Sequence, residues 1–510
     1  MSLQYGKLCS LILSEFFGET VEKVGRDLFR AGQKPLKLIP ASTNLSREEV
    51  RQSLCILIKY GLVSFVPGKI PSVPEYRLQT DNILVLLRYP KYLMLMKTLY
   101  GDEAESVVEE ICKRGINTMP RIILDAYKRI SSDAESGKKK NVTLQSLKDT
   151  FELLVNKQYL GRCPTVVEKS AMPDFIPEFE KQFQPVKIDM QKLIQAVTDD
   201  SITFDDNVLW EINYDRFHQD IRDDLLVAAM ARRFPPGGGD VMRLVLHQMQ
   251  LNSNPWAAVS NPIMLSEMKD MCRATKLDPQ ISKYLDEFMA VMAGDTDGFL
   301  IKADLSSSGY HVNLKRAVEE LTWCVLANGV DAKFGPSAAR IFRLIRDQKF
   351  IEQEEIQKRG MLPDKEAKFL TYSLLQSGWI QQHELKKGLP KAGPTKTFFL
   401  FCIDVDQVVR MYIEMCYKGL CNAIVRREHE KTENKCLLDK KQRIDAIALH
   451  MRKEGATDEQ VAEIEEMITP PEITLLETIH QKVNKLSQAE LQIDETLFIL
   501  QLYLRFQNNN

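Results

Sequence analysis

The stretch SREEVRQSLCILIKYGLVSFVPGKIPSVPEYRLQ, residues 46–79, contains the pattern that decides the fold. Ser46 followed by Glu49 is a capping box, which marks the start of a helix. The apolar residues of this helix then recur at helical spacing: Val50, Leu54, Leu57 and Ile58. Gly61 suits the left-handed position after a helix. Two strand-like segments follow around a turn that contains proline and glycine, so the stretch predicts a helix followed by a β-hairpin.

The same order occurs three more times, in residues 143–163, 278–314 and 363–403. Further amphipathic segments, such as residues 8–17 and 338–347, precede these copies. Helices followed by a helix, strand, loop and strand are typical of a winged helix. The repetition predicts a mainly α protein with small β-hairpins, built from four tandem, extended winged-helix domains.

Composition places the domain boundaries. We expect winged helices at residues 1–80, 81–163, 207–335 and 336–403. Residues 164–206 contain four prolines and no sustained periodicity, so they are the predicted linker.

The region from residue 404 to residue 510 has a different character. Residues 404–454 contain no proline and predict one helix of roughly 50 residues, about 75 Å long. Pro470 and Pro471 interrupt the pattern, and two further helices are expected around residues 476–486 and 491–504. The helices are expected to form an antiparallel coiled-coil stalk. Its packing residues are Leu437, Ile444, Met451, Leu476, Ile479 and Val483.

One part of this stalk carries no apolar residue. It is RREHEKTENK, residues 426–435. It is either a solvated surface or a docking face for a charged partner.

Length and charge limit what the chain can do. Its 510 residues are too many for one core, and the net charge is −2, from 68 Lys and Arg against 70 Asp and Glu. A nucleic-acid surface must therefore be a local patch. No apolar run approaches the ~20 residues that span a bilayer, and residues 1–10 lack the features of a secretory signal. Ten cysteines without a CxxC pair indicate a reducing compartment, the cytosol or the nucleus.

The sequence contains no recognisable catalytic motif. Seven histidines are scattered without HExxH, and neither GxSxG nor a dinucleotide fingerprint occurs. Asp295, Asp297 and Gly298 resemble the start of a calcium loop, but the glycine stands at the fourth position and Ser306 at the twelfth. We expect a protein that is not an enzyme and that has no cofactor and no metal site.

The outward helix faces of the four copies differ in charge. Acids dominate the first three: Glu48 and Glu49 in the first, Asp149 and Glu152 in the second, Asp286 and Glu287 in the third. Phosphates repel acids, so we expect these faces to contact proteins.

The fourth copy is basic and is the predicted nucleic-acid contact, without base specificity. Its outer helix face carries Lys365, Lys368, Tyr372 and Gln376. Its wing, residues 384–396, has four lysines against one acid: Lys386, Lys387, Lys391 and Lys396.

Several stretches together resemble one family. They are LCSLIL with FGE (8–19), LRYPKY (87–92), NYDRFHQ (213–219), ARIFRL (339–344), KEAK (365–368), KTENK (431–435), EIEEMIT (463–469), and VNKL with DET (483–496). In this order they resemble the large winged-helix subunit of eukaryotic RNA polymerase III, which anchors a three-subunit initiation subcomplex. The likeness extends over nearly the whole chain, and EIEEMIT and NYDRFHQ are its most specific parts.

The resemblance implies a nuclear, non-catalytic subunit of RNA polymerase III. Its implied partners are two smaller subunits of the initiation subcomplex, the clamp of the largest subunit, a promoter-bound initiation factor, and DNA near the melted region. The implied activity is promoter recruitment and opening for small RNAs such as tRNA and 5S rRNA. Family members carry a long, sometimes basic insertion between the second and third units, whereas residues 164–206 are few and not basic.

Two other functions remain open. One is a winged-helix scaffold subunit of another large complex, with no nucleic-acid role. Four wings argue against that. The other is a free, sequence-specific transcription factor, which the acidic outer faces oppose.

Overall fold

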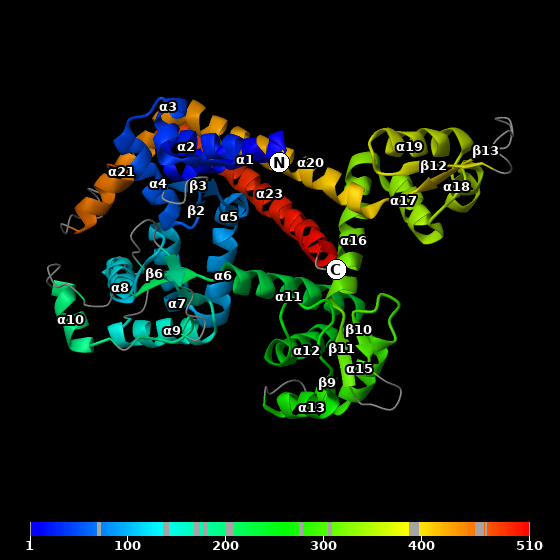
Figure 1. Cartoon of the computed structure of the whole chain (residues 1–510), viewed down its shortest axis with the longest axis horizontal. Coiled ribbons are helices and arrows are strands. Elements are labelled where there is room, and N and C mark those ends of the chain that lie inside the picture. The colour runs from blue at the N-terminus through cyan, green and yellow to red at the C-terminus, as the bar shows by residue number, and fades with distance from the viewer. Residues whose placement is uncertain are drawn as a thin grey trace. The chain divides into compact units, whose positions relative to one another are not determined.

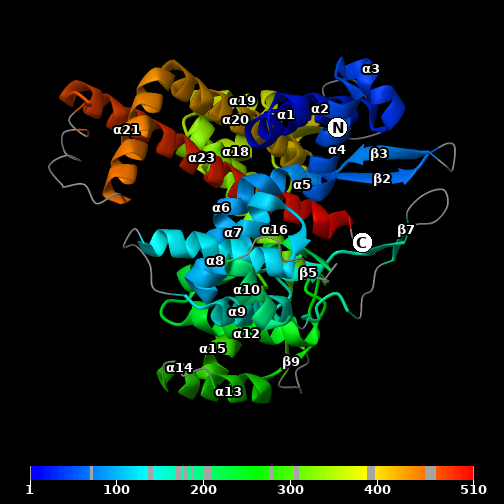
Figure 2. The same ribbon diagram turned by 90° about the vertical axis from the view of Figure 1, so that its left-hand side faces the viewer.

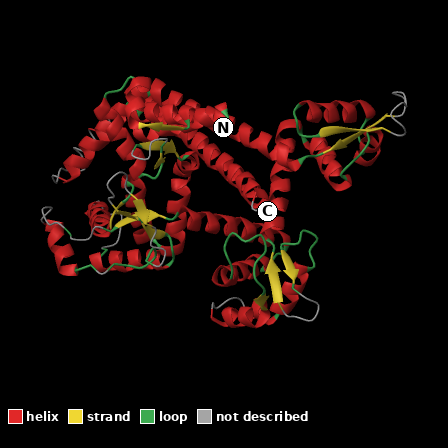
Figure 3. Ribbon diagram, in the orientation of Figure 1, coloured by secondary structure: helices red, strands yellow, loops and turns green. Residues whose placement is uncertain are grey.

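The computed structural model of the chain describes residues 2–68, 73–135, 142–167, 174–176, 181–186, 188–198, 204, 208–274, 279–303, 309–386, 397–453, 464 and 467–508. The chain divides into two compact units, Met1–Asp224 and Leu225–Asn510. Both units consist mainly of helices, with short antiparallel strands (Figure 3).

The first unit begins with helices that precede and contain the quoted stretch. The capping box is present, because Ser46 accepts from the Glu49 amide while the Glu49 carboxylate accepts from the Ser46 amide. The strands β2 and β3 form an antiparallel hairpin (Figure 2), and β3 also pairs with β1. The elements are α1 (Leu3–Phe17), α2 (Glu19–Ala31), β1 (Gln33–Pro35), η1 (Leu36–Leu38), α3 (Ile39–Thr43), α4 (Arg47–Lys59), β2 (Val63–Pro67) and β3 (Pro74–Leu78).

The second half of this unit repeats the order. Its sheet has the strand order β4-β8-β5, which matches the β1-β3-β2 order of the first half. The elements are α5 (Thr80–Val85), η2 (Leu86–Arg88), α6 (Tyr89–Tyr100), α7 (Asp102–Arg114), β4 (Asn117–Thr118), α8 (Met119–Glu135), α9 (Leu144–Asn156), β5 (Leu160–Arg162), β6 (Thr165–Val167), β7 (Asp174–Ile176), α10 (Met190–Thr198) and β8 (Leu209–Ile212).

The expected boundary at residue 163 and the inter-domain linker at 164–206 are wrong. Leu160 in β5 pairs with Ile212 in β8, and Trp210 in β8 pairs with Asn117 in β4. The segment 164–206 therefore lies between two strands of one sheet. It includes β6, β7 and α10, so it is an insertion between β5 and β8. Composition alone could not distinguish such an insertion from a linker, since both are rich in proline and polar residues.

Helix α11 (Tyr214–Arg233) carries the chain into the second unit. The next elements again form a sheet, in the order β10-β11-β9. The helix predicted after residue 278 consists of two short helices. The elements are α12 (Gly238–Asn252), β9 (Ile263–Met264), α13 (Leu265–Ala274), α14 (Pro279–Lys283), α15 (Leu285–Ala293), β10 (Leu300–Lys302) and β11 (Gly309–Val312).

The fourth repeat follows the long helix α16 (Leu314–Phe334). Its strands β12 and β13 pair over six residues, and an isolated bridge from Ile351 to Phe401 takes the place of the third strand. The elements are α17 (Pro336–Gln348), α18 (Gln353–Gly360), α19 (Asp364–Gln376), β12 (Gln381–Lys386) and β13 (Thr397–Cys402).

The described residues after the fourth repeat form helices α20 (Val405–Glu433), α21 (Lys435–Lys453) and α23 (Pro470–Asn508). Helices α20 and α23 lie side by side and run antiparallel (Figure 1), as the pairs Asp406–Tyr503 and Arg427–Glu490 require. The single helix predicted over 404–454 is interrupted at Asn434, and the two helices predicted after Pro471 are one continuous helix. Glu490, which lies between the two predicted helices, is buried.

Candidate nucleic-acid and partner surfaces

Helix α19 presents a basic and aromatic outer face. Asp364 and Glu366 favour the helix start, because acids in the first turn stabilise its positive end. The inner face is apolar apart from Thr371 and buries Ala367, Leu370, Thr371 and Leu374. The remaining positions face outward, and there Phe369 is 70% exposed and Tyr372 is 54% exposed. Lys365 and Lys368 are exposed on the same side of the helix.

Lys368, one of the two lysines of this face, forms an ion pair within its own helix. Lys368 Nζ lies 2.9 Å from a carboxylate oxygen of Asp364, one turn earlier. This pair is exposed on both sides, so it leaves the ammonium group accessible to other anions. The sequence prediction missed Phe369. Phe369 stands four residues after Lys365 and three before Tyr372, so helical spacing places it on the same face as these two residues.

Most of the predicted wing contact lies outside the described residues. Lys386 is the last residue of β12. Lys387, Lys391 and Lys396 fall in the segment 387–396, which is outside the described part of the chain. The structure therefore brings Lys365 and Lys368 together, and the contribution of the four wing lysines stays a prediction.

The corresponding helices of the other repeats carry acids at their predicted outward positions. Glu48 and Glu49 are exposed on α4, Asp149 on α9, and Asp286 and Glu287 on α15. Glu152, also on α9, is partly exposed. On α4 three cations are exposed as well, namely Arg47, Arg51 and Lys59.

A small apolar cluster joins α21 to the start of α23. Ile444, Ile468 and Leu476 are buried together, and Leu437, Leu438 and Ile464 pack against them. Among the other predicted packing residues, Ile479 is buried, while Met451 and Val483 are only half-buried.

The charged stretch 426–435 pairs largely within the chain. Arg427 is buried and donates to both carboxylate oxygens of Glu490, at 2.9 and 3.1 Å. Glu430 is also buried and lies 3.2 Å from Lys482 Nζ, and it pairs with Arg426. The hydrogen bond from Lys482 is the main cause that lowers the pKa of the Glu430 carboxyl. Two of its residues are thus neither solvated nor free for a partner, because they face α23.

Two of the stretches that carry the family resemblance meet inside the first unit. Tyr92 Oη lies 2.8 Å from His218 Nε2, and Tyr89 Oη lies 3.0 Å from Tyr214 Oη. The Tyr92 ring also packs on the Phe217 ring at a centroid distance of 4.7 Å. LRYPKY and NYDRFHQ therefore join α6 to α11, which gives these stretches a structural role.

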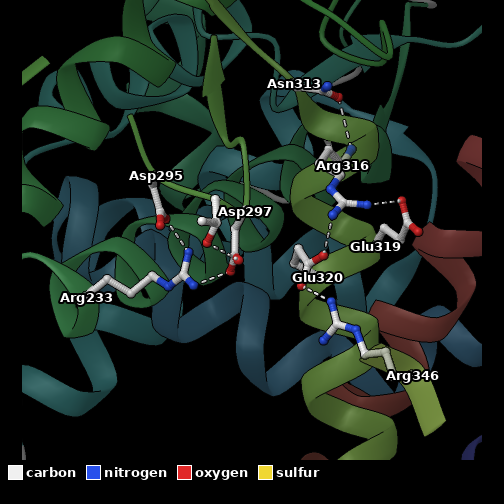
Figure 4. Close-up of polar contacts among 9 residues, drawn as sticks. Arg233, Asp295, Asp297, Asn313, Arg316, Glu319, Glu320 and Arg346 are labelled. Carbon is white, nitrogen blue, oxygen red and sulfur yellow. Dashed lines mark hydrogen bonds and ion pairs between the residues drawn. The ribbon is translucent and has the colours of Figure 1, made fainter. Parts of the chain in front are cut away.

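The two acids of the calcium-like sequence, Asp295 and Asp297, both pair with an arginine. Arg233 pairs with both Asp295 and Asp297 (Figure 4). A cation would have to displace Arg233, so the geometry opposes a calcium site.

A second group of ion pairs in Figure 4 links α16 to α17, because the buried carboxylate of Glu320 pairs with Arg316 and Arg346.

Within the described ranges, no group of three or more His, Cys, Asp or Glu side chains could hold a metal ion. No described helix has the length and apolarity of a membrane-spanning segment. All ten cysteines are free thiols.

Four family models match the chain. They are RNA polymerase III subunit RPC82 helix-turn-helix domain (residues 7–68), RNA polymerase III subunit RPC82 (149–321), POLR3C C-terminal winged-helix domain (326–403), and DNA-directed RNA polymerase III subunit RPC3 helical hairpin domain (436–499). The third of these ranges contains α17–β13, and the fourth contains α21 and most of α23.

Several proteins named DNA-directed RNA polymerase III subunit RPC3 are similar to the chain over nearly their whole length. The Homo sapiens protein is 35% identical and the Rattus norvegicus protein 34% identical, each over 98% of this chain and 98% of the relative. The Danio rerio protein is 33% identical over 99% of both.

Proposed function

Because the chain belongs to the RPC3 family of RNA polymerase III subunits, we propose that it is a non-catalytic subunit that acts in transcription initiation in the nucleus. In this role it binds two smaller subunits and the clamp of the largest subunit. It also contacts a promoter-bound factor and DNA near the melted region, and it helps to recruit and open promoters of small RNA genes such as those of tRNA and 5S rRNA.

The architecture proposed for this role is four tandem winged-helix domains followed by a helical stalk. The repeated order of helix, strand, two helices and hairpin supports it, together with the strand orders β1-β3-β2, β4-β8-β5 and β10-β11-β9. The antiparallel packing of α20 on α23 supports the stalk.

The outer face of α19 is the single observation that carries the DNA contact. Lysines bind phosphates as point charges, and exposed aromatic rings stack on bases of any sequence. Phosphate contacts and stacking carry no sequence information by themselves. We therefore infer contact with DNA near the melted region, without base specificity. The wing lysines Lys386, Lys387, Lys391 and Lys396 extend this contact.

The test separates initiation from catalysis. The polymerase is purified with either the wild-type subunit or a Lys365→Ala/Phe369→Ala variant. RNA synthesis is then measured on a promoter and on a template with a single-stranded tail, which needs no promoter opening. We expect the variant to lose promoter-dependent synthesis and to keep synthesis on the tailed template.

Two results would contradict the proposal. Equal loss on both templates would mean that the subunit acts in catalysis. Unchanged synthesis on both would favour the alternative, a scaffold subunit with no nucleic-acid role. A Leu99→Ala variant is the matched control, since Leu99 is an exposed apolar residue of α6, outside the proposed contact.

A further inference from the structure

Helices α2 and α3 of the first unit line an open hollow, which is distinct from the outer face of α19. Its volume is about 180 Å³. It is lined mainly by cationic and hydroxyl-bearing side chains, namely Lys23, Arg26, Asp27, Arg30, Ser42 and Thr43.

The three cations form a row along α2. Lys23, Arg26 and Arg30 stand at positions i, i+3 and i+7, so they share one helix face. At 1.5 Å per residue, the row spans about 10 Å. Successive phosphates of one nucleic-acid strand advance about 3.4 Å along the duplex axis, so a row of this length parallel to that axis spans about three phosphate steps.

The single acid of the lining is already neutralised. Asp27 lies 2.9 Å from Lys34 Nζ and accepts a second hydrogen bond from Ser42 Oγ at 2.8 Å. Both Asp27 and Lys34 are largely buried in this pair, at 16% and 17% exposure. The charge that remains on the lining is therefore that of the row of cations.

Two acids lie beside the row of cations. Glu19 is 84% exposed and reaches Lys23 only at 4.0 Å, whereas Glu22 is buried and lies 3.4 Å from Arg26. Arg30 is exposed and has no partner among the described residues.

A third acid, Glu49, is also near Lys23. Its carboxylate accepts the Ser46 amide in the capping box. This hydrogen bond is the main cause that lowers the pKa of Glu49, and Lys23 is a minor cause. A multivalent anion can therefore compete for the row of cations.

We propose that this hollow binds the phosphates of a nucleic-acid strand, as a second DNA contact separate from α19. Guanidinium groups donate paired hydrogen bonds to phosphate oxygens. The hydroxyls of Ser42 and Thr43 already donate to Asp27 and to the Ile39 carbonyl oxygen, so the cations carry the proposed contact. The strand then passes along α2, beside the three cations. The inference rests on the proposed function only in that the ligand is the same DNA.

The test uses the full chain and a fluorescent duplex. The affinity is measured by anisotropy between 50 and 200 mM salt for the wild type and a Lys23→Ala/Arg30→Ala variant. These substitutions leave the Arg26–Glu22 and Lys34–Asp27 pairs intact. Loss of two phosphate contacts lowers the salt slope by about 1.8. The variant should therefore lose about tenfold less affinity over this salt range than the wild type.

Two further variants make the outcomes distinct. Arg243→Ala/Arg273→Ala removes the same charge from exposed positions of the second unit and should keep the wild-type slope. Lys365→Ala/Lys368→Ala tests α19 independently. An unchanged slope for the α2 variant, with a reduced slope for the α19 variant, overturns the hollow and spares the proposed function. The reverse pattern supports the hollow and removes the α19 contact.

An acidic protein segment is the competing ligand. If DNA binding is unchanged in the α2 variant but binding of a fluorescent polyglutamate peptide is lost, the hollow takes an acidic peptide and the proposal is wrong. Retained circular dichroism excludes misfolding, because both substituted side chains are solvent-accessible.

Discussion

Two charge-rich helical segments of the second unit have opposite fates. In the segment 426–435, Arg427 and Glu430 are buried and paired with Glu490 and Lys482 of α23. On α19, Lys365 and Lys368 stay exposed beside Phe369. Charge along a helix is therefore accessible to a partner only where no neighbouring helix pairs with it. We expect substitutions in the first segment to change stability and those in the second to change DNA binding.

The largest effect is expected from Arg427→Met. This change leaves the Glu490 carboxylate buried without its partner, which costs about 3–5 kcal/mol. Hydrogen exchange of the α20 and α23 amides should report that loss of opening free energy. The double variant Arg427→Met/Glu490→Leu should recover most of it. If the single variant exchanges like the wild type, the pair is not the internal contact described above.

Phe369→Ala should weaken binding to a single-stranded oligonucleotide by about 1–3 kcal/mol, roughly 5- to 150-fold, because one stacking platform is lost. Its hydrogen exchange should stay that of the wild type, since a ring that is 70% exposed contributes little packing. Fluorescence anisotropy measures the binding, with Leu99→Ala as control. An equal loss for both variants would mean that the effect is not specific to α19.

The sequence predicted the parts of the fold that depend on neighbouring residues. The capping box of Ser46 and Glu49 is a local pattern and is observed, as is the burial of Val50, Leu54 and Leu57, whereas Ile58 of the predicted face is 36% exposed. The pairing of β8 with β5 was not predictable, because 46 residues separate the two strands. Likewise, only the partner helix determines that Arg427 and Glu430 are internal.

The candidate site, like the fold, could be predicted only where it depends on neighbouring residues in the sequence. Periodicity placed Lys365 and Lys368 on one face, as the structure does. It did not single out Phe369, since an aromatic residue in an amphipathic helix is more often part of the core. The hollow between α2 and α3 depends on how two helices pack, so no local pattern marks it.

Lys365→Ala/Lys368→Ala tests the electrostatic part of the comparison. Two lost phosphate contacts should lower the salt slope on duplex DNA by about 1.8. The stability should change little, because the Lys368–Asp364 pair is exposed. A wild-type slope, measured by anisotropy, would remove both lysines from the contact.

The smallest effect is expected from Lys441→Ala in α21. Lys441 Nζ lies 2.7 Å from Asp445 Oδ1, but both side chains are exposed, at 40% and 56%. Such a pair contributes less than about 0.5 kcal/mol. Hydrogen exchange should therefore be nearly that of the wild type, in contrast to Arg427→Met. A loss of opening free energy as large as that of Arg427→Met would show that exposed and buried ion pairs do not differ in their contribution to stability.

The most direct measurement is photo-crosslinking in the assembled polymerase on a promoter. A photoreactive amino acid replaces Phe369 on α19 in one sample and Leu153, an exposed residue of α9, in another. The account predicts a cross-link to DNA from position 369 and cross-links only to protein from position 153. Cross-links only to protein from position 369 would contradict it.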